Sequence, residues 1–195
     1  ILFSWGSPLS VPSEPKRANE PFLFKIIGMH QRLVNLTIKE LDSSKELLRL
    51  KDFLLFQPIN YPRYPRWVEG ICVPELESGW KKAFLAFYDG HLIGNAIYQP
   101  HKEVDLIEFK NLRIHPDYRG LYLGRVLVRQ VEIAAKGKGI ICDTREKQVQ
   151  EFLEGMNYKP VAIRDLYGGG LDIIMIKEMG PMRFELTTSG LLKPY

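Results

Sequence analysis

The fold is decided by the stretch Leu112-Arg-Ile-His-Pro-Asp-Tyr-Arg-Gly-Leu-Tyr-Leu-Gly124, which leads into an amphipathic segment that runs to Lys136. A β-rich run, Val104 to Ile114, ends at His115-Pro116, where proline stops a strand. The segment that follows has the periodicity of a helix, and Gly137 and Gly139 end it. Its predicted apolar face consists of Leu123, Val126, Leu127, Val131, Ala134 and Ala135. A second face carries Arg125, Arg129, Glu132 and Lys136.

The turn before this helix is suited to bind a phosphate. A helix N-terminus offers unpaired N–H groups and the positive end of a dipole. Gly120 and Gly124 allow a close approach of the backbone, and Arg119 and Arg125 add charge-assisted contacts. The turn therefore predicts a pyrophosphate site. The alternative is an ordinary strand–helix connection with two turn glycines and solvated arginines.

The run Ile114 to Gly124 resembles the acetyl-CoA-binding motif of the GNAT N-acetyltransferase superfamily, in which Arg/Gln-x-x-Gly-x-Gly/Ala opens the main helix. Further elements follow the family's order along the chain, and the resemblance covers about residues 29–180. These elements are a hairpin at 83–98 with Asp89-Gly90 at its turn, a strand at 140–142, a helix at about 147–154, the run Asn157-Tyr-Lys-Pro-Val161 and the closing strand Asp172–Lys177.

The resemblance implies an α/β (α+β) fold. Its central sheet is mixed and mostly antiparallel, has six to seven strands, is flanked by about four helices and contains a V-shaped splay for CoA. Residues 1–28 are proline-rich and are expected to be an appended, poorly ordered leader. Residues 29–180 form the expected domain, and residues 181–195 form a tail. Within the domain we expect a strand at 32–38, a helix that starts near Asp42 and stops before Pro58, and a proline- and aromatic-rich loop at 57–68.

The family resemblance also implies the cofactor site. The amides of Leu121, Tyr122, Leu123 and Gly124 would hold the CoA pyrophosphate, with Gly120, Arg119 and Arg125 beside them. The edge of the strand at Leu112, Arg113 and Ile114 would pair with the pantetheine arm. Three positions depart from the family pattern. Tyr122 replaces the first motif glycine, and Asn157 replaces a later glycine. Leu153 stands where the family often has a tyrosine that acts as the general acid.

Acetyl transfer to an amine needs a base and a proton donor. Glu108, on the strand before the motif, is the candidate base, and a solvated outward-facing glutamate is the alternative. Tyr158 and Tyr167 are the candidate acids, although each could instead be a packing tyrosine. Water could also serve, because a thiolate is a fair leaving group.

Composition narrows the remaining classes. The chain has 195 residues, a net charge of +4 and two cysteines, which predict reduced thiols in a cytoplasmic protein rather than a disulfide framework. No histidine or cysteine spacing predicts a metal site, and no apolar run is long enough for a membrane helix. Six arginines with Tyr61, Tyr64 and Trp67 could form a nucleic-acid surface, but no nucleic-acid motif accompanies them. These arginines are Arg63, Arg66, Arg113, Arg119, Arg125 and Arg129.

The sequence thus predicts an acetyl-CoA-dependent N-acetyltransferase that moves an acetyl group directly to a primary amine. The alternative is a non-catalytic acyl-CoA-binding or sensing module on the same scaffold. The expected partners are acetyl-CoA and an amine on a small molecule or a protein, without a metal, a membrane or a nucleic acid. The sequence identifies neither the acceptor nor the oligomeric state, and a homodimer stays open.

Overall fold

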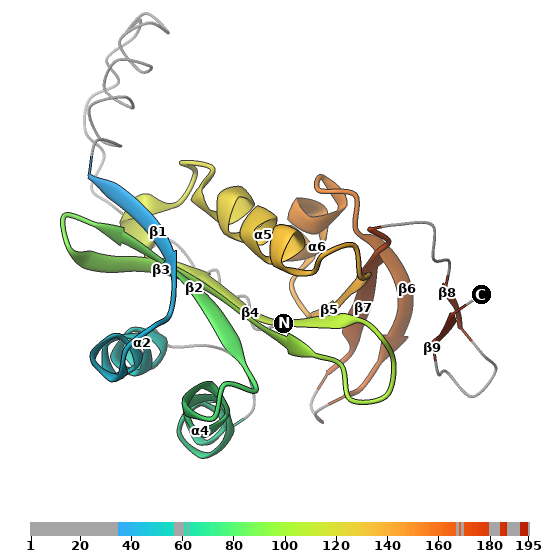
Figure 1. Cartoon of the computed structure of the whole chain (residues 1–195). Helices are drawn as coiled ribbons and strands as arrows, with labels where there is room; N and C mark the ends of the chain where they lie inside the picture. Colours follow the sequence, from blue (N-terminus) through green and yellow to red (C-terminus); the bar gives the residue numbers. More distant parts are fainter. Residues whose placement is uncertain are drawn as a thin grey trace, which may run out of the picture.

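The computed structural model describes residues 35–56, 61, 63–166, 168, 170–179, 184–186 and 192–194. The predicted leader and the first residues of the strand expected at 32–38 lie outside the described residues. Within them, a seven-stranded sheet runs through the domain (Figure 1). Its strands, in spatial order, are β1 (Leu36–Glu40), β2 (Lys82–Tyr88), β3 (His91–Pro100), β4 (Ile107–Ile114), β5 (Ile140–Thr144), β7 (Asp172–Lys177) and β6 (Lys159–Arg164).

Only the β4–β5 pair is parallel, and the other neighbours in this sheet pair antiparallel. This confirms the mixed, mostly antiparallel sheet that the sequence predicts. The β2–β3 hairpin is also confirmed, because Asp89 and Gly90 form its turn with φ of 48° and 76°. Positive φ at both central residues is what a tight two-residue hairpin turn needs.

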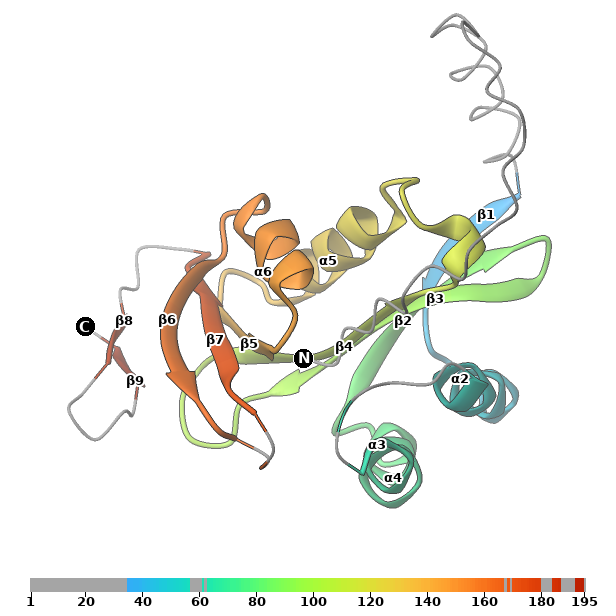
Figure 2. The ribbon, with the colours of Figure 1, turned by 180° about the vertical axis from the view of Figure 1, so that it is seen from behind.

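Four helical segments cover the two faces of the sheet. α2 (Ser44–Phe56) and a continuous segment of α3 (Tyr64–Trp67), η1 (Val68–Cys72) and α4 (Val73–Glu77) lie on one face. α5 (Leu123–Ala134) and α6 (Lys147–Glu154) lie on the other, as Figure 2 shows from behind. Each face therefore has its own hydrophobic core, because alternate side chains of a strand point to opposite sides.

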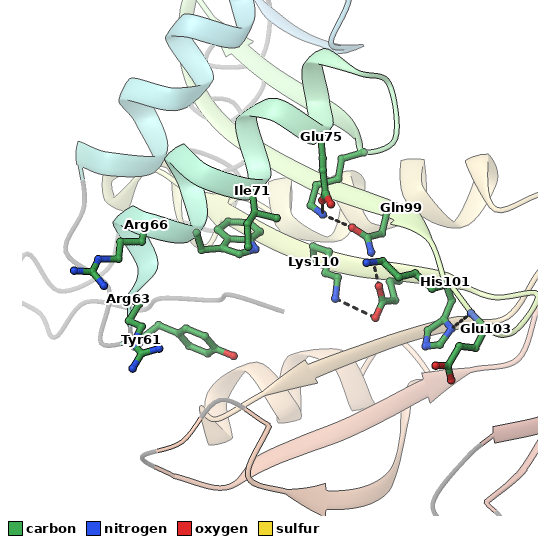
Figure 3. A pocket seen from close by; sticks show the side chains of 13 residues that line it. Tyr61, Arg63, Arg66, Ile71, Glu75, Gln99, His101, Glu103 and Lys110 are labelled. Carbon is green, nitrogen blue, oxygen red and sulfur yellow. Dashed lines mark hydrogen bonds and ion pairs between the residues drawn. The ribbon is translucent and has the colours of Figure 1, made fainter.

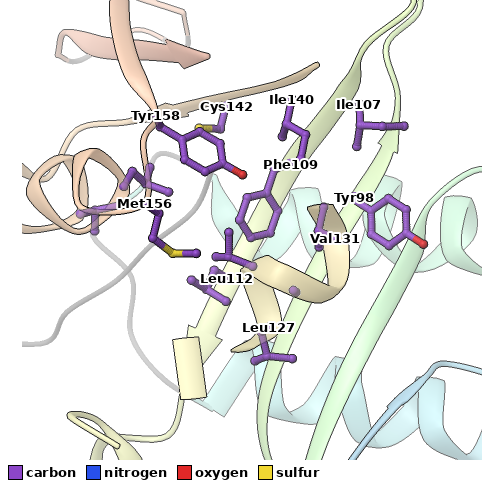
Figure 4. Close-up of a cluster of buried hydrophobic side chains, with 14 of the residues drawn as sticks. Tyr98, Ile107, Phe109, Leu112, Leu127, Val131, Ile140, Cys142, Met156 and Tyr158 are labelled. Atoms are coloured by element: carbon purple, nitrogen blue, oxygen red, sulfur yellow. The ribbon is translucent and has the colours of Figure 1, made fainter. Parts of the chain in front are cut away.

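The core under α5 is the larger of the two (Figure 4). Leu127 and Val131 of α5 pack in it against Phe109 of β4 and Ile140 of β5. Two predictions about the faces of α5 are wrong, and the first concerns its apolar face. Val126 is 39% exposed, while Val128 is buried in its place.

Glu132, expected on the charged face of α5, is also buried. Its carboxylate pairs with Arg129 and accepts a 2.8 Å hydrogen bond from Lys177 Nζ. Lys177 Nζ also donates to the carbonyl of Met156 at 2.8 Å. A buried carboxylate is tolerated when it is paired in this way, and here it joins α5 to the end of β7.

β4 contains an irregularity that positions the rest of the site. Phe109 pairs with Tyr98 and Asn111 pairs with Ile97, so Lys110 is an extra residue with no partner on β3. A bulge of this kind reverses the alternation of faces beyond it. β4 and β5 also pair at only two positions, Ile107 with Ile140 and Glu108 with Ile141, and then separate. This separation is the predicted V-shaped splay.

The proline-rich segment is not a loop throughout. Residues 57–60 and 62 lie outside the described residues, but a helix begins at Tyr64 and continues to Glu77. Pro65 occupies the first turn, where its missing N–H is not needed, and Pro74 follows a π-helical turn at Val68–Cys72. The loop predicted at 57–68 is therefore wrong from Tyr64 onward, because a proline in the first turn of a helix does not break it.

Three further features complete the fold. β8 (Phe184–Leu186) and β9 (Leu192–Pro194) pair as a separate two-stranded sheet within the predicted tail. Cys72 and Cys142 are free and buried, and burial raises the pKa of Cys72 to about 12. Among the described helices, none has the length and apolarity needed to cross a bilayer.

Gly94 of β3 offers a test of the packing between the sheet and α5. A Cβ built there would lie 2.9 Å from Ile114 Cδ1 and 3.1 Å from the carbonyl oxygen of Arg113. We expect Gly94→Ala to lower the free energy of unfolding by about 1–3 kcal/mol, because overpacking forces neighbours to shift. Gly70→Ala is the control, since nothing lies within 4 Å of its added Cβ. Urea unfolding measures both, and equal stability of Gly94→Ala and the parent would contradict this packing.

Candidate active site

A cavity of about 310 Å³ lies where the end of β4 meets the beginning of α5. We call it the cofactor cavity, for the role that the sequence predicts for its residues. Eight of the ten predicted cofactor residues line it, together with Tyr118 and Phe152. The eight are Leu112, Ile114, Arg119, Gly120, Tyr122, Leu123, Gly124 and Arg125. The structure therefore brings together most of the predicted phosphate site.

The N-terminus of α5 faces this cavity, and no side chain of the described residues caps it. Tyr122 occupies the N-cap position and makes no side-chain capping bond, and no acidic residue lies in the first turn. The first backbone bond of this helix in the described chain runs from Val126 N–H to Tyr122 O. The preceding N–H groups at Leu123, Gly124 and Arg125 are thus available to an anion.

Among the described residues, two arginines are the cationic side chains that line the cavity, and no carboxylate lines it. Arg119 Nε donates to the carbonyl of Ile114 at 3.3 Å. Arg125 donates to the carbonyl of Gly155 at 3.1 Å and lies 5.8 Å from the ring centre of Phe152. These contacts hold both side chains beside the helix N-terminus, so the site has positive charge at a fixed place.

Two departures from the family motif are compatible with the backbone. Tyr122 and Asn157 adopt φ of 60° and 66°, the left-handed conformation that glycine takes most readily. Asn157 accepts this conformation easily, whereas Tyr122 does so at a cost of order 1 kcal/mol. Tyr122 therefore keeps the turn in the shape that a motif glycine would give it, with its side chain 65% exposed.

Arg113 and Leu121 do not line the cavity. Arg113 is buried on the opposite face of β4, where its guanidinium donates to the carbonyl of Leu54 at the end of α2 and lies 5.6 Å from the ring centre of Tyr64. Its side chain anchors α2 and α3 to the sheet. The backbone edge at Arg113 stays the predicted partner of a pantetheine arm.

A second cavity, of about 780 Å³, lies on this opposite face of the sheet (Figure 3). The helical segment α3–η1–α4 forms one wall. The ends of β3 and β4, residues 101–103 between these strands, Tyr61 and Lys81 contribute the rest. We call it the acceptor cleft, for the role that we propose for it below. Figure 3 shows Tyr61, Arg63 and Arg66 at one end and His101 and Glu103 at the other. Glu108, the predicted base, lines the cleft together with Lys110.

Glu108 is held by a chain of polar contacts. Its carboxylate accepts a 2.6 Å hydrogen bond from Gln99 Nε2 and pairs with Lys110 Nζ at 3.0 Å. The amide oxygen of Gln99 accepts from Lys81, which is buried and also pairs with Glu75. This chain fixes the orientation of a carboxylate whose side chain is still 22% exposed to the cleft.

Of the two predicted proton donors, the structure describes Tyr158, which lines neither cavity. Tyr158 is buried in the core under α5, where its ring centre lies 5.4 Å from Lys177 Nζ and burial raises the pKa of its hydroxyl. Tyr167 lies outside the described residues. Leu153 is fully buried. The position at which the family often has a tyrosine as general acid is therefore occupied here by a core residue.

The arginine–aromatic set considered as a nucleic-acid surface is divided between different places. Arg113 and Tyr64 are buried, Arg119 and Arg125 line the cofactor cavity, and Arg63 and Arg66 line the acceptor cleft. A buried tyrosine cannot stack on a base, so this set forms no continuous binding face. In the described part of the chain, no cluster of histidine, cysteine, aspartate or glutamate could hold a metal ion.

Sequence reasoning missed the polar chain behind Glu108 and the cleft wall. One signal was present in β4, where the apolar residues are Ile107 and Phe109 and then Leu112 and Ile114. This change from odd to even positions marks the bulge at Lys110. The helical wall of the cleft could have been predicted from a four-residue spacing, which is typical of one helix face. The residues with this spacing are Arg63, Trp67, Ile71 and Glu75.

The fold, the cavity at the start of α5 and the cleft on the opposite face are the features expected of an acyltransferase domain. Comparison with known protein families agrees with this class. The family model described as acetyltransferase (GNAT) family matches residues 47–154, more than half of the chain. The protein therefore belongs to the GNAT acetyltransferase family. A search of curated protein sequences gives no match.

Solved structures with the same fold include a GNAT-family protein from Desulfovibrio desulfuricans, at 15% identity and a TM-score of 0.65 over 74% of this chain and 99% of that one. The ribosomal-protein-S18-alanine N-acetyltransferase from Escherichia coli aligns at 19% identity with a TM-score of 0.59, over 74% and 94% of the two chains. An aminoglycoside 6'-N-acetyltransferase complexed with coenzyme A aligns at 22% identity with a TM-score of 0.57, over 74% and 98%. At these identities the likeness shows the fold.

Gly124→Trp tests the cofactor cavity directly. A Cβ at Gly124 would make only ordinary contacts, 3.5 Å from Phe152 Cζ and 3.8 Å from Leu112 Cδ2, so the substitution should fill the cavity without unfolding the domain. We expect the variant to melt near the parent temperature but to lose the stabilisation that millimolar acetyl-CoA gives the parent.

Ile133→Trp is the matched control, because Ile133 is 70% exposed on the same helix and does not line the cavity. It should respond to acetyl-CoA as the parent does. A Gly124→Trp variant that is stabilised as strongly as this control would remove the assignment of the cavity.

Proposed function

We propose that this protein is an acetyl-CoA-dependent N-acetyltransferase that transfers an acetyl group to a primary amine. The observation that carries the proposal is the N-terminus of α5, which has no side-chain cap within the described chain. It opens into a cavity whose described lining contains two arginines and no carboxylate. The adjoining strand β4 also presents Glu108 to a separate cleft. One similar solved structure is a complex with coenzyme A, which supports the proposed use of acetyl-CoA.

The residues of the cavity fit the pyrophosphate and pantetheine parts of the ligand. The N–H groups of Leu123, Gly124 and Arg125 can donate to phosphate oxygens, with Arg119 adding charge. Beyond the bulge, the edge of β4 separates from β5, so its backbone groups can pair with an extended amide-bearing arm. Bound acetyl-CoA would supply a thioester acetyl group.

Glu108 is the proposed base on the acceptor side. Its carboxylate takes a proton from the ammonium form of the acceptor, directly or through a water molecule. The amine nitrogen then forms a C–N bond with the acetyl carbon, the C–S bond breaks, and the electron pair leaves with the thiolate of CoA. The thiolate takes up the second proton of the amine nitrogen, directly or through water, which leaves a neutral amide and CoA thiol. Gln99 and Lys110 act as positioning residues because they fix the carboxylate that accepts the proton.

A non-catalytic acyl-CoA-binding module is the second candidate. It is favoured because neither Leu153 nor Tyr158 supplies a proton donor to a cavity. Leu153 is an apolar core residue, and Tyr158 lines neither cavity. Departure of the thiolate does not require a protein acid, because a thiol ionises with a pKa of about 8.5. Turnover decides between the two functions, since binding of acetyl-CoA is common to both.

The Glu108→Gln variant tests the proposed reaction. Release of CoA thiol is followed with the parent across a panel of amino acids, polyamines and peptides. For any accepted amine, we expect Glu108→Gln to lower kcat/KM by about 10²–10⁴-fold, the usual contribution of a general base, while binding of acetyl-CoA is unchanged.

Glu103→Gln is the control, because Glu103 lines the same cleft and the described structure gives its carboxylate no ion pair. Activity of Glu108→Gln equal to that of Glu103→Gln would exclude Glu108 as the base. Binding of acetyl-CoA without thiol release for any amine would favour the sensing module.

A further inference from the structure

We infer that the acceptor is an acidic peptide segment, whose carboxylates bind to Arg63 and Arg66 while its amine lies at Glu108. The inference rests on the proposed function, because it names the class of substrate for the same site. It draws on the charge, the pairing and the dimensions of the acceptor cleft.

The described residues that line the cleft carry more positive than negative charge. They include five cationic side chains and the three carboxylates of Glu75, Glu103 and Glu108. Two of the carboxylates are already paired with cations of the cleft, Glu75 with Lys81 and Glu108 with Lys110. The charge that is left for a ligand therefore comes mainly from Arg63, Arg66 and Lys102.

Arg63 and Arg66 are exposed, and neither has an ion pair within the described residues. Both lie at the same end of the cleft, beside Tyr61 (Figure 3). Guanidinium groups bind carboxylates in a two-pronged geometry that lysine does not offer. A polycationic acceptor would meet repulsion here, whereas an acidic one would be attracted.

Arg63 also has a strained backbone. Its φ is 60° at the start of α3, a conformation that favours glycine or asparagine. An arginine here costs of order 1 kcal/mol relative to glycine, and strain of this kind is found preferentially at binding sites. Among the described residues no interaction of the Arg63 side chain within the protein offsets it, which is consistent with a role toward a ligand.

The dimensions favour an extended chain over a free amino acid. Arg63, Trp67, Ile71 and Glu75 follow one face of the helical wall, which spans roughly 18 Å at the α-helical rise. An extended peptide covers this length with about five or six residues. The volume of about 780 Å³ also lies at the upper end of the range for small-molecule sites. Exposed Ile71 and the partly buried Trp67 give apolar contacts between the charged ends.

The test compares two six-residue peptides labelled with fluorescein at the C-terminus. One has three glutamates after an N-terminal alanine, and the other has three lysines at these positions. Fluorescence anisotropy in the presence of CoA measures their affinity for the full chain. We expect the glutamate peptide to bind at least about tenfold more tightly, which corresponds to 1.4 kcal/mol. Unlabelled glutamate should not displace it at comparable concentrations.

The double variant Arg63→Glu/Arg66→Glu should lose at least about tenfold in affinity for the glutamate peptide. Lys45→Glu/Arg164→Glu is the control, because it changes the net charge equally at exposed positions outside the cleft. It should bind the glutamate peptide within about twofold of the parent.

Three outcomes would overturn the inference: equal or tighter binding of the lysine peptide, an equal loss in the control variant, or full displacement by free glutamate. Release of CoA thiol from acetyl-CoA is followed on the same samples across the panel of amines. Failure of the proposed function appears as absence of thiol release for every amine, whereas failure of this inference alone leaves release with other amines intact.

Discussion

The bulge at Lys110 is the constraint on which the arrangement of this site depends. Side chains of a regular strand alternate, so residues 108 and 112 would face the same side of the sheet. With one extra residue between them, Glu108 lines the acceptor cleft while Leu112 lines the cofactor cavity on the opposite face. β4 and β5 stop pairing just beyond Glu108, between the strand positions that line the two cavities. A single strand thus serves both halves of the proposed reaction.

The remaining elements support this strand from both sides. On the cofactor side, α5 packs Leu127 and Val131 into the larger core, which fixes its uncapped N-terminus against the end of β4. On the acceptor side, buried Arg113 ties α2 and Tyr64 to β4, so the helical wall of the cleft has a defined distance from Glu108. Each site is therefore positioned by packing on its own face of the sheet. The proposed anion site consists of backbone N–H groups at the start of α5, where the described protein provides no side-chain cap.

Much of this could be predicted from sequence because the signals are local. The Asp89-Gly90 turn, the helix after Gly124 and the strand at Asp172–Lys177 depend on neighbouring residues, and the structure confirms them. Burial of Glu132 could not be predicted, because its partner Lys177 lies 45 residues further along the chain. The helix at Tyr64 was missed because Pro65 and Pro74 are compatible with a helix only at a first turn or after a π-turn. Pairing of Gln99 with Glu108 requires the register of β3 on β4, which no local pattern encodes.

A crystal structure of the protein with CoA tests the central claim most directly, because it shows both faces of β4 at once. The account predicts that the pyrophosphate accepts hydrogen bonds from the amides of residues 123–125. It also predicts that the pantetheine arm runs along β4 and that the sulfur lies in the splay, on the way to Glu108. A CoA molecule bound elsewhere, or one whose sulfur points away from the acceptor cleft, would contradict the account.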